Sequence, residues 1–105
     1  MLDTRIIKEV VYSTIPNELI DQVFVFGSKA RGDDNIDSDT DICIIIKHSL
    51  ERNEIKAYRY RLNSIFASKH RMPTDILIKT NHEFNKYKDV VGVIENIIAN
   101  EGIIA

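Results

Sequence analysis

Hydrophobic residues follow helical spacing in two long stretches of the chain. Residues 4–14 carry apolar side chains three and four positions apart, which predicts a helix with Asp3 or Thr4 as its N-cap. Residues 50–69 repeat this spacing over a longer stretch, which predicts the longest helix. Ser49 is the N-cap expected for it, because a serine before an apolar periodic run is a typical helix start.

Three shorter helical segments are also expected. Residues 28–31 fit a single helical turn, and residues 82–87 fit a short helix capped by Asn81. The apolar spacing that starts at Val90 predicts a last helix, which ends before Gly102.

Three runs of apolar residues between these helices read as strands. They cover residues 23–26, 41–47 and 74–79, and an acidic loop over residues 33–40 separates the first two. The second run is apolar on both faces, which is typical of a central strand. We therefore predict an α/β (α+β) fold, in which a small mixed β-sheet of at least three strands has helices packed against it.

Length and composition limit the class of protein. The chain of 105 residues is expected to form a single domain over residues 1–105, and its 44% apolar content excludes a disordered chain. Its single cysteine, Cys43, excludes a disulfide framework. No apolar run approaches the ~18 residues that span a bilayer, and the start Met1-Leu2-Asp3 does not resemble a signal peptide. We expect a soluble cytoplasmic protein without membrane contact.

The charge is slightly acidic, at −2, so strong direct nucleic-acid binding is not expected. Five of the sixteen acidic residues fall within nine positions: Asp33, Asp34, Asp37, Asp39 and Asp41. A cluster of like charges needs a chemical explanation, because neighbouring carboxylates repel one another.

One candidate site lies directly after the first strand. Gly27 lets backbone N–H groups approach an anion closely, and Ser28 adds a hydroxyl group. This pair fits a phosphate-binding turn, although a plain strand-to-helix turn is the favoured interpretation when the pair is taken alone.

A second candidate site lies where the second strand begins. Asp39 and Asp41 fall on the same side of the chain, and hard oxygen ligands of this kind suit Mg²⁺. A solvated acidic loop is the alternative, but these two residues run directly into a buried strand. A calcium-binding loop is excluded, because Ile42 and His48 stand where Gly and Glu are required.

Asp75 is the third candidate. It lies near the start of the third strand, where an unpaired carboxylate is costly to bury. It is either solvent-exposed or, if its strand lies beside the second one, a third ligand in a site for two metal ions.

Taken together, the segments Gly27-Ser28-Lys29-Ala30-Arg31-Gly32 and Ser38-Asp39-Thr40-Asp41-Ile42, with a later strand carrying Asp75, resemble the nucleotidyltransferases with the DNA-polymerase-β-like fold. The resemblance covers residues 23–78. With the short chain, it points to the minimal nucleotidyltransferases of MNT–HEPN toxin–antitoxin pairs.

The resemblance implies an activity and a set of roles. A nucleotide, with ATP as the expected substrate, would be transferred to a hydroxyl group with the help of two Mg²⁺ ions. Asp39 and Asp41 would hold both metals, and Asp75 would complete the site that activates the acceptor. Gly27 and Ser28 would hold the β and γ phosphates.

Other residues of the motif are open to two interpretations. Arg31 either reaches phosphate or, as we favour, pairs with the acidic loop, and Ser38 either orients Asp39 or turns the loop. Lys29 is expected to point to solvent, and Cys43 to fill space in the core.

The leading hypothesis is a protein adenylyltransferase that acts as antitoxin on a HEPN-type RNase toxin, in a hetero-oligomer with it. The alternatives are an antitoxin that acts by contact alone and a small-molecule nucleotidyltransferase of the aminoglycoside type. The apolar end Ile103-Ile104-Ala105 either packs on the domain or docks onto a partner or another copy.

Overall fold

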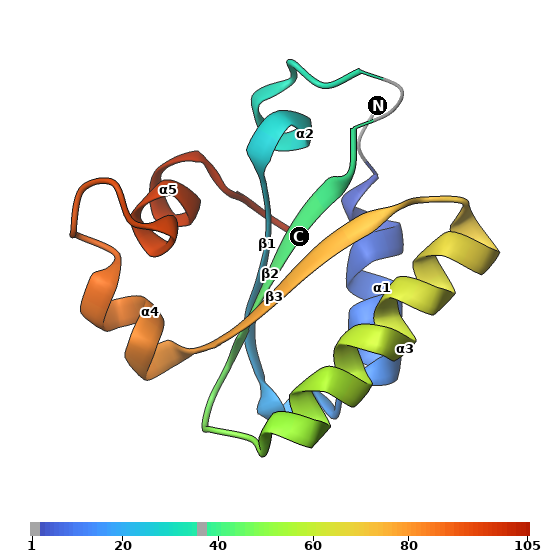
Figure 1. Cartoon of the computed structure of the whole chain (residues 1–105), viewed down its shortest axis with the longest axis horizontal. Helices are drawn as coiled ribbons and strands as arrows, with labels where there is room; N and C mark the ends of the chain where they lie inside the picture. Colours follow the sequence, from blue (N-terminus) through green and yellow to red (C-terminus); the bar gives the residue numbers. More distant parts are fainter. Residues whose placement is uncertain (1–2, 36–37) are drawn as a thin grey trace.

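A computed structural model describes residues 3–35 and 38–105, which form a sheet with helices on both faces (Figure 1). Its strands are β1 (Ile20–Phe26), β2 (Thr40–Ile46), β3 (Thr74–Thr80) and β4 (Ile103–Ile104), in the order β3-β2-β1-β4. β1 is antiparallel to both β2 and β4, whereas β2 and β3 are parallel. The predicted mixed sheet is confirmed, and its first strand begins three residues earlier than predicted.

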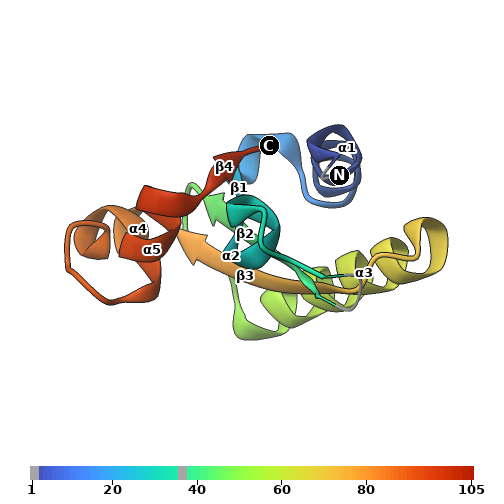
Figure 2. The same cartoon turned by 90° about the horizontal axis from the view of Figure 1, so that it is seen from above.

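The helices cover the two faces of the sheet in pairs. They are α1 (Thr4–Thr14), α2 (Gly27–Arg31), α3 (Arg52–His70), α4 (Asn81–Tyr87) and α5 (Ile94–Glu101), with a short 3₁₀ turn at Asn17–Leu19. Figures 1 and 2 show α1 and α3 on one side of the sheet and α4 and α5 on the other. Within the described residues, no helix is long and apolar enough to cross a bilayer.

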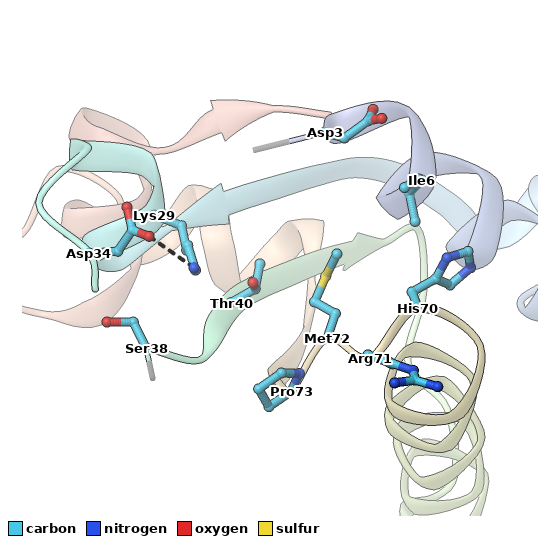
Figure 3. Close-up of a pocket in the computed structure, with 10 residues that line it drawn as sticks. All are labelled: Asp3, Ile6, Lys29, Asp34, Ser38, Thr40, His70, Arg71, Met72 and Pro73. Atoms are coloured by element: carbon cyan, nitrogen blue, oxygen red, sulfur yellow. Dashed lines mark hydrogen bonds and ion pairs between the residues drawn. The ribbon is translucent and has the colours of Figure 1, made fainter. Parts of the chain in front are cut away.

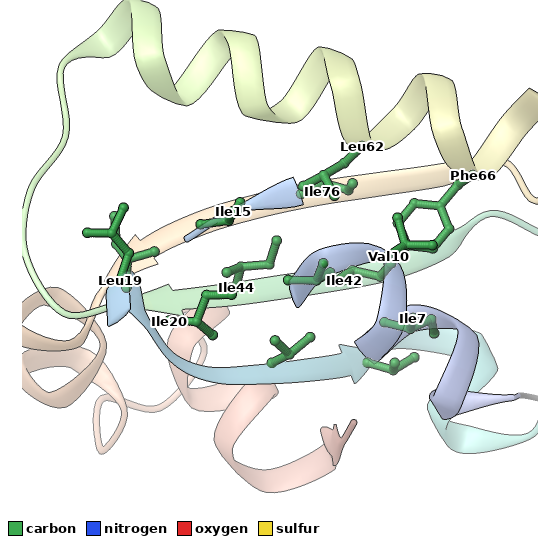
Figure 4. Packing of buried hydrophobic residues seen from close by; sticks show 14 residues of the cluster. Ile7, Val10, Ile15, Leu19, Ile20, Ile42, Ile44, Leu62, Phe66 and Ile76 are labelled. Atoms are coloured by element: carbon green, nitrogen blue, oxygen red, sulfur yellow. The ribbon is translucent and has the colours of Figure 1, made fainter. Parts of the chain in front are cut away.

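The central strand β2 is buried on both faces, as its composition predicts. Ile42, Ile44 and Ile46 pack with residues of α1 and α3 in the larger core cluster (Figure 4). Cys43 and Ile45 pack on the opposite face with residues of α4 and α5. Because side chains alternate along a strand, Asp41 lies on the Cys43 face, toward α4 and α5.

Helix α1 has the predicted bounds, but the caps of two other helices differ from the prediction. Glu51, not Ser49, is the N-cap of α3, where it forms a reciprocal capping box with Glu54. At α4 the hydroxyl of Thr80, not Asn81, accepts a hydrogen bond from the Glu83 N–H. In both cases a neighbouring residue within two positions supplies the oxygen acceptor instead.

The end of the chain packs on the sheet. Ile103 and Ile104 pair with β1, and the N–H of Ala105 donates to the carbonyl of Val23. The backbone of this segment is therefore paired within the chain, although both isoleucine side chains stay exposed. Val90 lies in the turn before α5 and not in the helix, which was predicted too long.

Candidate active site

Two of the predicted carboxylates lie side by side on neighbouring strands. In the parallel pairing of β2 and β3, Asp41 is the direct register partner of Asp75. Paired strands lie ~4.8 Å apart, and both residues share the face that carries α4 and α5. Asp75 was a candidate ligand only if its strand lies beside the second one, and β3 does pair with β2.

Gly27 closes this site from the side of β1. It has a φ of 72°, a conformation that glycine adopts without a steric cost. A Cβ atom at Gly27 would collide with Oδ2 of Asp41, so only glycine lets the backbone approach the carboxylate this closely. The glycine of the predicted phosphate turn therefore also forms a wall of the carboxylate site.

The electrostatics around Asp41 are unfavourable for a charged carboxyl group. Partial burial raises its pKa above the ordinary value, and the nearby charges of Asp75 and Asp39 raise it further. Arg31 opposes these effects by lowering it. The charges of the other two predicted carboxylates thus both act on Asp41.

These oxygen ligands match Mg²⁺ in chemistry, although they are not arranged as a complete cage. Across residues 3–35 and 38–105, no three His, Cys, Asp or Glu side chains converge as a group that could hold a metal ion. Mg²⁺ is commonly held by one or two carboxylates plus substrate phosphates, which an adjacent aspartate pair satisfies. A cation would also offset the repulsion that Asp41 experiences.

Arg31 pairs with the acidic loop, which is the interpretation favoured from the sequence. Its Nε donates to Asp33 at 3.0 Å, and its Nη1 donates to Glu101 at 3.4 Å. Glu101 lies at the end of α5, seventy positions away, and local sequence gives no signal for this contact. The pair links α2 to α5 beside the carboxylates.

The two serines of the motif occupy different positions. Ser28 lies in the first turn of α2 next to Gly27, and its carbonyl accepts from the Gly32 N–H. Ser38 turns the loop, since its hydroxyl accepts from the Asn35 N–H. Asp37 lies outside the described residues.

Lys29 differs from its prediction. Its side chain is only 22% exposed, and its ammonium group donates to Asp34 at 2.9 Å instead of pointing to solvent. The acidic loop folds back over α2, which the sequence pattern did not indicate.

Sequence reasoning also missed an ion pair at the opposite end of the sheet. Glu95 on α5 is buried, and its carboxylate lies 3.6 Å from the ammonium group of Lys79 on β3. Lys79 also lies 3.5 Å from Glu83 on α4. This cluster ties both helices to the sheet, and the only signal for it was an acidic residue inside an apolar helical stripe.

Cys43 is the expected core residue. It is buried, and burial raises the pKa of its thiol to about 12. We expect the native protein to resist modification by a thiol-reactive dye at pH 8, and the unfolded protein to react fully. Rapid labelling without denaturant would show that this face of the sheet opens.

A family model described as a nucleotidyltransferase domain matches residues 5–104, almost the whole chain. No curated protein matches the chain.

Several solved structures are similar to this one. A crystal structure of a toxin-antitoxin with AMP-PNP has a TM-score of 0.71 and 19% identity, covering 98% of this chain and 72% of that one. A mutant of the toxin-antitoxin MntA-HpeT has a TM-score of 0.70 and 17% identity over the same shares. A proposed nucleotidyltransferase from Sulfolobus solfataricus has a TM-score of 0.57 and 27% identity, covering 96% of this chain and 74% of that one.

Proposed function

The chain belongs to the nucleotidyltransferase domain family, and we propose that it uses Mg²⁺ to transfer AMP from ATP to a hydroxyl group of a partner protein. One observation carries this proposal. Asp41 lies in register with Asp75, and Gly27 packs directly against the Asp41 carboxylate. This arrangement brings two aspartates and the Gly27 turn to one end of the sheet, which supports the proposed roles.

The carboxylates have distinct roles in this proposal. Asp39 and Asp41 would hold the Mg²⁺ ions, and Asp75 would complete the site next to the acceptor. Bound Mg²⁺ would supply neutralisation of the negative charge on the triphosphate. Asp41 is suited to contact both ions, because the charges of Asp75 and Asp39 both raise its pKa.

The phosphates are assigned to the turn after β1. The backbone N–H groups at Gly27 and the hydroxyl of Ser28 would hold the β and γ phosphates, while Arg31 stays paired with Asp33 and Glu101. The acceptor oxygen bonds to the α phosphorus, the bond to the pyrophosphate oxygen breaks, and the hydroxyl proton passes to Asp75. Positioning and charge neutralisation account for most of the rate in such transfers.

We assign the acceptor to a HEPN-type toxin, with this chain as its antitoxin in a hetero-oligomer. Two similar structures are toxin-antitoxin complexes, and one of them contains AMP-PNP. These similarities support a toxin partner and an adenine nucleotide, while the HEPN class follows from the motif resemblance.

The test is transfer of labelled AMP to the protein encoded beside this gene. Wild type with ATP and Mg²⁺ should label the partner, whereas Asp75→Asn should lower the rate by at least about 100-fold. Asp21→Asn is the matched control, because Asp21 is exposed at the opposite end of β1. It should label the partner at the wild-type rate.

Two outcomes would contradict the proposal: no label with wild type, or equal label with Asp75→Asn. Co-expression with the toxin then distinguishes the alternative. If Asp75→Asn still protects cells, the chain neutralises the toxin by contact alone.

A further inference from the structure

Helix α3 and its flanks form a strongly basic region of the chain. Residues 47–71 contain seven of the fourteen Lys and Arg residues and only two of the sixteen Asp and Glu residues. Their formal charge is +5, whereas the charge of all other residues together is −7. The net charge of −2, from which strong nucleic-acid binding was not expected, is therefore an average over two oppositely charged regions.

The basic helix and the acidic site lie on opposite faces of the sheet. Figures 1 and 2 show α3 beside α1, on the side away from α4 and α5. Asp41 and Asp75 belong to the side of α4 and α5. A layer of helices is ~10 Å thick, which exceeds the Debye length of about 8 Å at physiological salt. The acidic site therefore does not cancel the attraction of α3 for a dissolved anion.

The cations of this region have no acidic partners within the chain. Across residues 3–35 and 38–105, no cation between positions 47 and 71 forms an ion pair, although four of the seven cations elsewhere do. Glu51 and Glu54 are held in the capping box at the start of α3. In Figure 3, Arg71 stands at the end of α3 with its guanidinium group directed away from Asp34. This positive charge is thus available to an external partner.

One row of exposed side chains runs along α3. Arg52, Lys56 and Tyr60 are four positions apart, so they follow one another on one face of the helix at a rise of about 6 Å. Arg61 is also exposed, directly after Tyr60. Cations therefore lie on both sides of the tyrosine ring along the helix. We call these four residues the basic face.

Tyr60 indicates which kind of polyanion this face fits. It is 78% exposed, and no ring or cation contact within the described part of the chain involves it. Surfaces that bind single-stranded nucleic acid combine cations, which contact phosphates, with aromatic rings, on which unpaired bases stack. A duplex keeps its bases stacked on one another, so their faces are not available to an exposed ring.

A lipid surface fits α3 less well. A helix that binds a bilayer inserts an apolar face between the lipids. Leu62 and Phe66 of α3 are fully buried in the protein core instead. Only the ring of Tyr60 would be left to insert, so the exposed surface of α3 favours a nucleic acid.

From this placement we propose that the basic face of α3 binds single-stranded nucleic acid. Arg52, Lys56 and Arg61 contact phosphates, and one base stacks on the ring of Tyr60. The 19 residues of α3 span ~28 Å, which is enough for several nucleotides. This inference does not rest on the proposed transfer reaction, because it involves other residues on the opposite face of the sheet.

The test is fluorescence anisotropy of a labelled single-stranded RNA of about 12 nucleotides, titrated with the intact protein. EDTA is present and ATP is absent, so that the transfer site holds neither metal nor nucleotide. Binding is expected in the micromolar range and should weaken as salt is raised. The same RNA annealed to its complement should bind more weakly, because its bases cannot reach Tyr60. Inorganic polyphosphate, which has charge and no bases, should also bind more weakly.

Substitutions of Tyr60 test the stacking contact. Tyr60→Leu keeps an apolar side chain without the flat ring and should weaken binding of the single strand about 10-fold. Tyr60→Phe keeps the ring and should bind as wild type. Because Tyr60 is exposed, neither change is expected to disturb the fold.

Substitutions of the cations test the phosphate contacts. Lys56→Gln and Arg61→Gln should each lower the slope of log affinity against log salt by about 0.7, as expected for one phosphate contact with a single strand. Lys86→Gln is the matched control, because it removes the same charge from an exposed position of α4 on the other side of the sheet. It should leave both affinity and slope unchanged.

Several outcomes would overturn the proposal. These are no change in anisotropy at millimolar protein, equal binding of duplex and single strand, wild-type affinity in Tyr60→Leu, or equal losses in Lys56→Gln and Lys86→Gln. Tighter binding to phosphatidylglycerol vesicles than to RNA would assign the basic face to a membrane instead. None of these results depends on whether the chain transfers a nucleotide, so this proposal and the previous one fail separately.

Discussion

Asparagine in place of Asp41 is expected to abolish nucleotidyl transfer and, at the same time, to make the protein more stable. Activity should fall by at least about 10³-fold, because Asp41 is proposed to hold both Mg²⁺ ions. The melting temperature without Mg²⁺ should rise, because asparagine removes a carboxylate that is partly desolvated and repelled by two others. Few substitutions lower activity and raise stability together, unless the residue serves function at the expense of stability.

The pH dependence follows from the raised pKa of Asp41. Its ordinary value is 3.8, and the value in the folded chain is higher. Ionised Asp41 therefore destabilises the fold at neutral pH, and this penalty disappears as pH falls through the raised pKa to below 3.8. The difference in melting temperature between Asp41→Asn and wild type should be constant near neutrality and vanish in acid.

Thermal unfolding with and without Mg²⁺ completes this test. Mg²⁺ should stabilise wild type and have no effect on Asp41→Asn, since binding to the folded state alone raises stability. Asp21→Asn should match wild type in transfer activity, in the pH dependence of its melting temperature and in its stabilisation by Mg²⁺. Full transfer by Asp41→Asn would remove Asp41 from the site, and a lowered melting temperature would refute the account of its electrostatics.

Alanine in place of Gly27 is expected to damage both stability and activity. The added Cβ collides with the carboxylate of Asp41, and the φ of 72° is unfavourable for alanine by about 1 kcal/mol. We expect a melting temperature lowered by at least about 5 °C and transfer reduced about 100-fold, since Asp41 must move away from Asp75. Thermal unfolding and the labelling assay measure the two effects.

Gly32→Ala is the matched control for this substitution. Gly32 has a similar φ of 80°, but a Cβ there meets no atom within 4 Å. Gly32→Ala carries the backbone cost without the collision. The difference between the two variants in melting temperature and activity therefore isolates the contact with Asp41. Equal losses in both would show that the close approach of Gly27 to Asp41 has no role in activity.

The sequence predicted the parts of the structure that depend on local periodicity. The apolar run from Ile42 to Ile46 indicated a central strand, and helical spacing defined α1 with its observed bounds. Strand alternation also predicts that Asp39 and Asp41 lie on one side of the chain, but Asp39 precedes β2, which begins at Thr40, so this stays a prediction. The neighbourhood of Asp75 depended on strand order, which the motif resemblance supplied and periodicity alone did not.

The missed features depend on contacts between distant segments or on competition between similar groups. Ser49 and Glu51 are both able to cap α3, and the reciprocal bond with Glu54 favours the latter. Lys29 turns inward because the acidic loop folds back and brings Asp34 within reach. Glu101 meets Arg31 only after the end of the chain has packed beside β1.

The two-residue strand β4 has a consequence for the order of folding. It joins β1 across 80 positions of the chain, from Phe24 to Ile104, whereas the contacts of β1 with β2 and of α3 with β3 close much shorter loops. Contacts that are far apart in sequence form slowly, and a short edge ladder holds few hydrogen bonds. The β4 segment should therefore close last and detach first, and the amide of Ala105 should exchange with solvent by a local opening well below the free energy of global unfolding.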